Sequence, residues 1–225
     1  MKIRPVILCG GAGTRLWPNR KNHQAKQFID FGGWNLFEKA LERIKGNIFD
    51  YPVISTNLKY LKKVKYFLKK SKVKRYDIVL EPSKKNTAPA VLATSLIRKI
   101  PNEQPLIFFP VDHLLENLGE LNKSIIKNKK NLNKKNIFIF GIKPSYPSQD
   151  YGYFLTKNKK KLNKVYKFVE KPSKSRAKKV ISKKAYWNCG IFFAKKESIV
   201  NNFKKHCPKI YKKCLNSVIK SRFKQ

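Results

Sequence analysis

Short apolar runs that alternate with helix-like segments constrain the fold of this chain more than any other feature of its sequence. Runs rich in β-branched and aromatic residues predict strands at residues 5–9, 52–56, 77–80, 105–110, 136–142, 165–169 and 187–194. Between the first five runs, apolar residues return every three or four positions, which predicts helices over residues 36–44, 60–68 and 88–100. Strands that alternate with helices favour an α/β fold, a Rossmann-like three-layer sandwich with a mostly parallel central sheet.

The rest of the chain is interpreted from its charge and periodicity. Residues 127–135 and 158–164 are lysine-rich, which is typical of solvated loops or helix faces. The tail, residues 195–225, is predicted to be helical, with an inner stripe formed by Ile199, Phe203, Ile210, Leu215 and Ile219. No clear linker interrupts the 225 residues, and a chain of this length buries a core without disulfides, so we expect one domain.

Two absences predict the compartment. No apolar stretch reaches the roughly 18–20 residues that a membrane helix needs. The four cysteines include no Cys-x-x-Cys pair, so the sequence shows neither a redox motif nor a zinc site. We therefore expect a soluble, cytoplasmic protein whose thiols are free and mostly buried.

The charge is extreme for a chain of this size. There are 52 Lys and Arg residues against 13 Asp and Glu residues, which gives a net charge of +39. Such a balance favours polyanions as partners, whether nucleic acid, an anionic membrane surface or phosphorylated metabolites. A genome-wide bias toward lysine explains the same number with solvated surface lysines, so charge does not identify the function.

The first strand runs directly into a glycine-rich segment, Gly10-Gly11-Ala12-Gly13-Thr14-Arg15-Leu16. Glycines let a backbone approach a ligand closely while its amides turn toward that ligand, which indicates a phosphate cradle. The spacing differs from the Rossmann fingerprint and from a Walker A loop. Arg15 and Lys26 would add positive charge for phosphate oxygens. A simple tight turn is the alternative interpretation.

Six further motifs follow in order: Glu81-Pro82, Asn86-Thr87-Ala88-Pro89-Ala90, Pro110-Val111-Asp112-His113, Tyr151-Gly152-Tyr153, Val169-Glu170-Lys171-Pro172 and Trp187-Asn188-Cys189-Gly190. With them the chain resembles the mannose-1-phosphate guanylyltransferases, sugar-phosphate nucleotidyltransferases that make GDP-mannose, from Pro5 to about Phe193. The resemblance implies the nucleotide-diphospho-sugar transferase fold, which is glycosyltransferase-A-like. It also implies a single nucleotidyltransferase domain over residues 1–225, shortened at its C-terminal end relative to the family.

The resemblance assigns a role to each matching position. It makes Arg15, Lys26 and Asp112 catalytic, with Asp112 as the ligand of a divalent cation, Mg²⁺. The nucleotide, GTP, would be bound by Gly10, Gly11, Gly13, Thr14, Glu81, Asn86, Thr87 and Ala88. The sugar phosphate, mannose-1-phosphate, would be bound by Gly152, Glu170, Lys171 and Asn188.

The residue types also suit these roles chemically. Asp112 follows a strand, where open α/β sheets place ligands, and its carboxylate can hold Mg²⁺ against phosphate oxygens. The carboxylate of Glu81 can accept hydrogen bonds from the two donors on the Watson–Crick edge of guanine. The alternatives are a turn cap at Asp112, a surface acid at Glu81, and a helix cap at Asn86 or Thr87.

The implied reaction needs no protein nucleophile, because the attacking phosphate oxygen of the sugar phosphate is already ionised. It would attack the α-phosphorus of GTP in line, and pyrophosphate would leave. A sister enzyme that uses another base or sugar is one alternative. A degenerate polyanion-binding or nucleic-acid-binding protein is another, although in the leading interpretation nucleic acid binds only non-specifically and there is no membrane partner.

Some positions depart from the family pattern. Ala25 stands where the family has a proline before the lysine, and Cys189 stands where it has a serine. The family's downstream Asp-Val-Gly segment, which supplies a second metal contact, has no counterpart before Gln225. A homo-oligomer and a separate C-terminal partner chain are therefore both open, as is a weakly active form.

Overall fold

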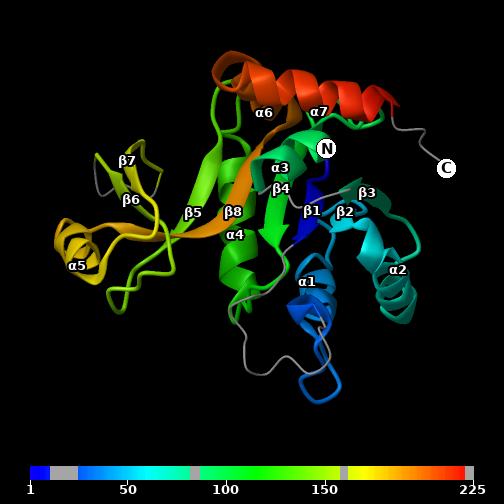
Figure 1. Cartoon of the computed structure of the whole chain (residues 1–225), viewed down its shortest axis with the longest axis horizontal. Coiled ribbons are helices and arrows are strands. Elements are labelled where there is room, and N and C mark those ends of the chain that lie inside the picture. The colour runs from blue at the N-terminus through cyan, green and yellow to red at the C-terminus, as the bar shows by residue number, and fades with distance from the viewer. Residues whose placement is uncertain (11–24, 82–86, 158–161, 221–225) are drawn as a thin grey trace. The chain divides into compact units, whose positions relative to one another are not determined.

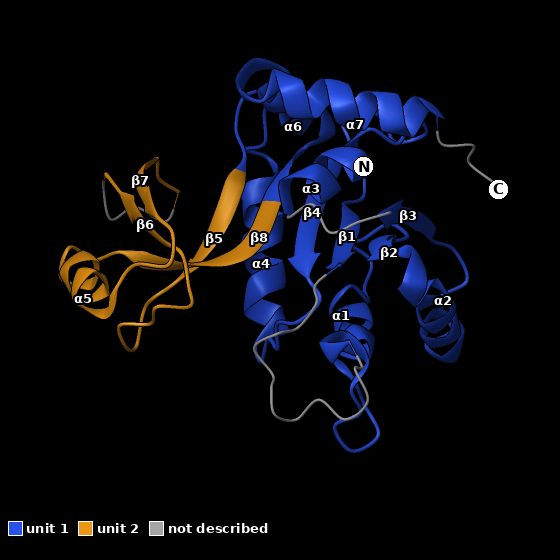
Figure 2. Cartoon of the chain, viewed as in Figure 1, with its two compact units in different colours: residues 1–137, 193–225 blue, residues 138–192 orange. Residues whose placement is uncertain are grey.

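The computed structural model describes residues 1–10, 25–81, 87–157 and 162–220 (Figure 1). The chain forms two compact units (Figure 2). Unit 1 comprises Met1–Ile137 and Phe193–Gln225, and unit 2 comprises Phe138–Phe192. The interpretation of residues 1–225 as one nucleotidyltransferase domain stays a prediction.

Unit 1 is built on parallel strands: β1 (Arg4–Cys9), β2 (Val53–Asn57), β3 (Asp77–Glu81) and β4 (Pro105–Pro110), in the order β3-β2-β1-β4. Strands β1 and β4 are buried along almost their whole length. Continuous apolar runs are typical of parallel strands that are covered on both faces. The expected α/β architecture is therefore confirmed, and each of these strands lies within one residue of its predicted range.

Helices α1 (Leu36–Arg43) and α2 (Leu61–Lys70) pack on one hydrophobic core with strands β1 and β2, and the short helix η4 (Leu58–Tyr60) leads into α2. That core contains Ile7 and Ile54 from the strands and Phe37 and Leu68 from the helices. Helix α1 begins at a reciprocal cap, because Asn35 accepts from the backbone of Glu38 and donates to its carboxylate.

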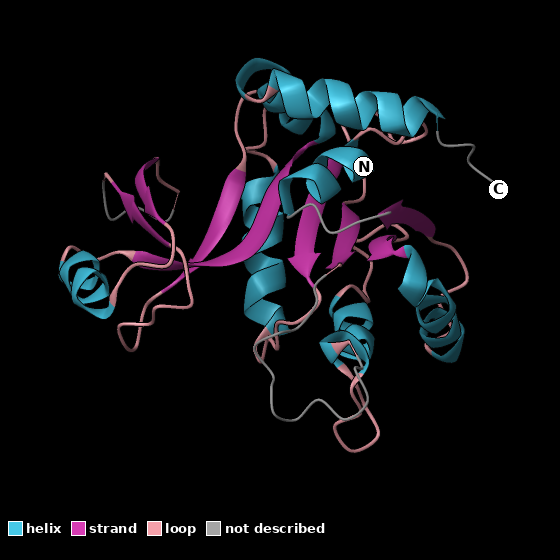
Figure 3. Ribbon diagram, in the orientation of Figure 1, coloured by secondary structure: helices cyan, strands magenta, loops and turns pink. Residues whose placement is uncertain are grey.

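Helix α3 (Thr87–Ser95) contacts strands β1, β2 and β3 and packs against α6 (Lys196–His206) and α7 (Pro208–Lys220), as Figure 3 shows. Lys196 is buried at this junction, where its Nζ donates to the carbonyls of Ile97 and Ile100 just beyond the end of α3. Helix α4 (Leu118–Lys129) follows β4 and includes the start of the first lysine-rich tract. No helix in the described ranges is long and apolar enough to span a bilayer.

The predicted inner stripe of the tail is wrong at two positions. Ile199 is 1% exposed, but Ile210 and Ile219 are 37% and 57% exposed. The reason is the break between α6 and α7 at Cys207 and Pro208, which starts a new helix, so one period does not run through the tail. The helix predicted over residues 88–100 is shorter than expected and ends at Ser95.

Unit 2 contains β5 (Phe138–Ile142), β6 (Tyr153–Thr156), β7 (Val165–Val169), α5 (Lys174–Ser182) and most of β8 (Tyr186–Lys195). Strand β6 pairs antiparallel with both β7 and β8, while β5 pairs with β8. Helix α5 packs its Ala177 and Val180 against Tyr153, Leu155 and Val169 of the sheet. The sequence did not predict β6, which has only four residues and directly follows Gly152.

Candidate active site

The carboxyl ends of the parallel strands of unit 1 bring three predicted site residues to one edge of the sheet. Gly10 follows β1, Glu81 ends β3, and Asp112 lies two residues beyond β4. The register aligns these ends, since Asn57 of β2 pairs with Glu81 and the backbone amide of Val111 donates to Leu8 at 3.2 Å. This edge is where open α/β sheets bind their ligands.

The carboxylate of Glu81 lies beside Gly10. A Cβ atom built on Gly10 would lie 3.1 Å from Glu81 Oε1, so a side chain at position 10 would crowd the carboxylate. Ser55 Oγ donates to the same oxygen at 2.6 Å, and Asn57 Nδ2 donates to the backbone carbonyl of Glu81 at 2.9 Å. Glu81 is therefore held at the start of the glycine-rich segment and is not a free surface acid.

The sequence did not predict that Ser55 and Asn57 contact Glu81. Their signal was present, because Ser55 and Asn57 are polar, lie two positions apart near the end of a strand, and therefore share one face of the sheet. Their partner is distant in sequence, with Ser55 and Glu81 separated by 26 residues. Periodicity within one strand could not identify that partner.

Lys26 and Asp112 form an ion pair between the nitrogen Nζ and the oxygen Oδ2. Lys26 begins the short helix η3 (Lys26–Phe28), which the core holds in place. The ring of Phe28 stacks on Phe67, with centroids 5.8 Å apart, and Ala25 on the other side of Lys26 is only 2% exposed. The small side chain at position 25 thus fits a buried position. Lys26 and Asp112, two of the residues predicted to be catalytic, lie in contact.

Opposing effects act on the acidity of Asp112. Burial favours its neutral form, but the hydrogen bond and charge of Lys26 outweigh burial and lower the pKa of the Asp112 carboxyl below its usual value. Burial lowers the pKa of the adjacent His113. Asp112 is therefore ionised at neutral pH, as a ligand of a cation must be.

Arg43, the last residue of α1, is a further residue that the sequence did not predict. Its guanidinium donates to the carbonyl of Pro110 at 3.1 Å and to the carbonyl of His113, and so it holds both ends of the segment that carries Asp112. Burial lowers the pKa of Arg43 to about 10, and the charge of Asp112 opposes that shift. Arg43 remains a cation at neutral pH and positions the Asp112 segment.

Cys9, the last residue of β1, is fully buried beside this edge. Its carbonyl accepts from Thr56 Oγ1 at 3.3 Å and from Gln27 Nε2 at 3.4 Å. Burial raises the pKa of the Cys9 thiol to about 12. All four cysteines are free, as expected, although Cys189, Cys207 and Cys214 are only half-buried.

In unit 2, three predicted sugar-phosphate residues form one row across the sheet. Register pairs Tyr153 with Val169 on β7 and with Trp187 on β8, so the next row contains Gly152, Glu170 and Asn188. Two contacts support this row. The backbone amide of Asn188 donates to the carbonyl of Gly152 at 2.8 Å, and Glu170 Oε2 lies 2.9 Å from where a Cβ of Gly152 would be.

Lys171 follows this row with an unusual backbone. Its φ of 36° is positive, which costs free energy for a residue with a side chain and is rarer still before a proline. Its Nζ lies 3.6 Å from Glu170 Oε1, and both side chains are more than half exposed. A cation and a carboxylate are thus presented together at the end of β7.

Two further predicted nucleotide-binding residues lie at the start of a helix. Thr87 and Ala88 are exposed in the first turn of α3. The predictions for Gly11, Gly13, Thr14, Arg15 and Asn86 lie outside the described residues. Cys189, in place of the family's serine, donates its thiol hydrogen to the carbonyl of Phe140 at 2.9 Å and so joins β8 to β5.

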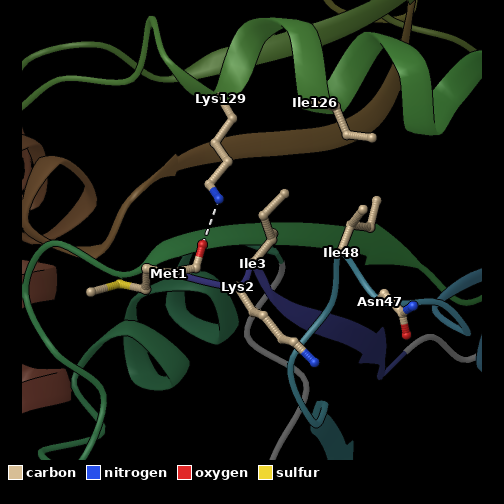
Figure 4. Close-up of a pocket in the computed structure, with 7 residues that line it drawn as sticks. All are labelled: Met1, Lys2, Ile3, Asn47, Ile48, Ile126 and Lys129. Carbon is tan, nitrogen blue, oxygen red and sulfur yellow. Dashed lines mark hydrogen bonds between the residues drawn. The ribbon is translucent and has the colours of Figure 1, made fainter.

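A cavity of about 450 Å³ lies at the other end of β1 (Figure 4). It is lined by residues 1–3, residues 47–48 and two side chains of α4, Ile126 and Lys129. Lys129 Nζ donates to the carbonyl of Met1 there. Among the predicted site residues that the structure describes, none lines this cavity. It lies at the amino end of β1, whereas Gly10 follows the carboxyl end of that strand.

Comparison with known proteins places these features in a family. The chain is 31% identical over 226 residues to the alginate biosynthesis protein AlgA of Pseudomonas fluorescens, covering 96% of this chain and 46% of that protein. It is 33% identical over 226 residues to a mannose-1-phosphate guanylyltransferase of Escherichia coli, covering 95% and 48%. The chain thus spans about half the length of these relatives, and the resemblance seen in the motifs is confirmed.

Solved structures share the fold. The chain superposes on the crystal structure of mannose-1-phosphate geranyltransferase from Thermus thermophilus with a TM-score of 0.82, at 24% identity, covering 98% of this chain and 65% of that one. It superposes on mannose-6-phosphate isomerase from Helicobacter pylori with a TM-score of 0.81, at 28% identity, covering 97% and 80%. The nucleotidyl transferase family profile matches residues 4–222. The chain therefore belongs to the nucleotidyl transferase family.

Proposed function

We propose that this chain transfers GMP from GTP to mannose-1-phosphate, giving GDP-mannose and pyrophosphate. The observation that carries this proposal is the gathering of Gly10, Glu81 and Asp112 at the carboxyl edge of the unit 1 sheet, in a chain whose relatives include mannose-1-phosphate guanylyltransferases. In this proposal unit 1 binds the nucleotide and unit 2 binds the sugar phosphate.

Glu81 is the proposed base-reading residue. Its carboxylate would accept from the N1 hydrogen and the N2 amino group of guanine. Ser55 already donates to Oε1, which fixes the carboxylate and leaves further lone pairs, because an ionised carboxylate has about four acceptor positions. Adenine presents a lone pair at N1 and would be repelled by the same group.

A divalent cation fits the donors that are present. No group of three or more His, Cys, Asp or Glu side chains converges in the part of the chain that the structure describes. Asp112 is nevertheless sufficient, because Mg²⁺ in such sites is usually held by one or two carboxylates together with phosphate oxygens and water. When bound there, Mg²⁺ would neutralise charge on the triphosphate.

The chain's own residues then have positioning and electrostatic tasks. One phosphate oxygen of mannose-1-phosphate forms a bond to the α-phosphorus of GTP, the bond from that phosphorus to the bridging oxygen breaks, and pyrophosphate leaves with the electron pair. Lys26 supplies a cation beside the phosphates, with Arg15 proposed for the same task. Arg43 holds the Asp112 segment in place from α1.

The row in unit 2 has the chemistry to bind a sugar phosphate. Glu170 would accept hydrogen bonds from sugar hydroxyls, and the Asn188 amide can both donate and accept. Gly152 lies between them, and its lack of a Cβ leaves the Glu170 carboxylate the room that it occupies. Lys171 would pair with the phosphate. Its positive φ sets the direction of the chain just after β7.

The test is pyrophosphate release with each nucleoside triphosphate and several sugar-1-phosphates. We expect Mg²⁺-dependent release with GTP and mannose-1-phosphate. Release with a different pair would indicate a sister enzyme, and equal release without any sugar phosphate would contradict a transferase. Nucleic-acid binding without turnover would favour the degenerate polyanion-binding protein.

Asp112→Asn should lower turnover at least tenfold, since about 1.4 kcal/mol of lost transition-state stabilisation has that effect. The low pKa of Asp112 means that its charge is present at neutral pH and is lost only when the pH falls below the usual carboxyl range. Its titration should therefore leave the rate flat from about pH 5 to 8. An unchanged rate in Asp112→Asn at saturating Mg²⁺, with an unchanged melting temperature, would remove Asp112 from the site.

A further inference from the structure

A second row, made of aromatic residues, lies beside the proposed sugar-binding row in unit 2. Register pairs Phe154 of β6 with Phe168 of β7 and with Tyr186 of β8. Side chains alternate between the faces of a sheet, so this aromatic row shares its face with Gly152, Glu170 and Asn188. The row between them, which contains Tyr153 and Val169, faces α5.

Phe168 is the member of this row that reaches the site. Its Cζ lies 2.9 Å and its Cε1 3.3 Å from the position that a Cβ of Gly152 would occupy. Glu170 Oε2 lies 2.9 Å from the same point. An aromatic ring edge and a carboxylate therefore converge over one glycine, and any side chain at position 152 would displace them both.

Phe168 is one of the exposed residues of the edge strand β7, of which only Val169 is buried. It is 48% exposed, whereas Phe154, its partner across the sheet, is 5% exposed. Leaving half of a phenyl ring in water gives up hydrophobic free energy that burial would supply. A half-exposed ring next to a carboxylate has the two properties that a sugar ring requires, an apolar surface for its C–H groups and an acceptor for its hydroxyls.

We propose that Phe168 is a sugar-binding residue whose ring packs against the C–H face of the hexose ring, while Glu170 and Asn188 bind the hydroxyls. This inference rests on the proposed function and adds a specificity-determining residue to it. The ligand class is a hexose-1-phosphate in its cyclic form. An acyclic phosphate has no ring face to cover Phe168 and gains nothing from it.

The test is Phe168→Ala, compared with wild type in calorimetric binding of mannose-1-phosphate and in steady-state kinetics. We expect the dissociation constant and the KM for mannose-1-phosphate to rise about 5- to 10-fold, as loss of part of a phenyl contact would give, while the KM for GTP stays unchanged. Phe168→Trp should keep binding within about twofold of wild type, because it retains an aromatic face. Phe168→Leu should fall between wild type and Phe168→Ala, because leucine keeps apolar area but lacks the flat aromatic face.

Tyr166→Ala is the matched control. Tyr166 is on the same strand and is 55% exposed, but it lies where the pairing of β6 and β7 shifts register, two residues farther from Glu170. We expect its removal to leave sugar-phosphate binding unchanged. Glycerol phosphate supplies the ligand control, because its weaker binding should not change in Phe168→Ala.

The outcomes separate this inference from the proposed function. If wild type binds and uses mannose-1-phosphate but Phe168→Ala and Phe168→Leu do the same with unchanged constants, the role of Phe168 is wrong and the function stands. If wild type binds hexose-1-phosphates without releasing pyrophosphate, the function is wrong and the binding data still decide the role of Phe168. If wild type binds no hexose-1-phosphate, both are wrong.

Discussion

The carboxylate of Glu81 has two neighbours that determine what it can do. Ser55 donates to it and Gly10 leaves it room, so one oxygen is anchored while the group faces the glycine-rich segment. Only the position of Glu81 after an apolar strand could be predicted from the sequence. The anchoring hydroxyl comes from β2, and pairing between strands, not local pattern, brings it there.

Glu81→Gln should narrow the preference for GTP over ATP. A bidentate contact to a base edge is worth about 1–3 kcal/mol of discrimination, so the ratio of kcat/KM values should fall by roughly 5- to 150-fold, mainly through weaker use of GTP. Ser55→Ala is the control, because it removes the anchor and keeps the charge, and we expect a smaller fall. An unchanged ratio in Glu81→Gln would show that other groups select the base.

The ends of two helices show why element boundaries were harder to predict than the elements themselves. Helix α2 ends with Lys72 at a φ of 56°, where the amide of Val73 donates to Leu68 and that of Lys72 to Lys69, both at 2.9 Å. Helix α5, which the sequence did not predict, ends in the same way at Lys184. Glycine usually occupies this left-handed position, so the sequence lacked the residue that marks a helix end.

The strands differ in how well local sequence predicts them. Strand β6 has only four residues, and its first residue, Tyr153, also belongs to the Tyr151-Gly152-Tyr153 motif. Its pairing with two neighbouring strands therefore defines it better than its sequence does. The parallel strands β1 and β4 were predicted well because burial along almost their whole length makes residues 5–9 and 105–110 continuously apolar. The local hydrophobic pattern of a strand thus indicates its burial more clearly than it indicates which strands it pairs with.

Lys72→Gly should stabilise the protein, since a left-handed backbone strains a residue that carries a Cβ. We expect the free energy of unfolding to rise by about 0.5–1 kcal/mol, after the greater entropy of glycine in the unfolded chain is included. Lys65→Gly, at an exposed position inside α2, should instead lower the free energy of unfolding by about 1 kcal/mol. Urea unfolding of both variants measures these changes, and a destabilised Lys72→Gly would refute the argument from strain.

At the scale of the whole molecule, charge dominates. The 13 acidic residues can neutralise few of the 52 basic ones, and a net charge of +39 attracts any polyanion. This net charge could be read from the sequence alone, because it depends on the residue counts and not on the fold. The sequence did not show how the proposed site residues are divided between the units, with Glu81 and Asp112 in unit 1 and Glu170 and Asn188 in unit 2.

Binding to nucleic acid and binding to GTP should respond differently to salt. A long polyanion releases many counterions when lysines contact its phosphates, so its affinity should fall steeply between about 50 and 200 mM salt. GTP offers three phosphates and a base, so its affinity should fall much less. Fluorescence titrations with a random-sequence oligonucleotide and with GTP, over the same salt series, measure both slopes. Sequence-selective binding that salt does not weaken would favour a nucleic-acid-binding protein.

Cys9 gives the protein an internal reporter. Its thiol is fully buried, with a pKa of about 12, whereas Cys189, Cys207 and Cys214 are half-buried. Thiol reagents attack the thiolate, so Cys9 can be alkylated only while β1 is separated from its neighbours. The alkylation rate of Cys9 therefore measures how often β1, the strand that leads into the glycine-rich segment, separates from its neighbours. A ligand bound at that edge of the sheet should lower this rate.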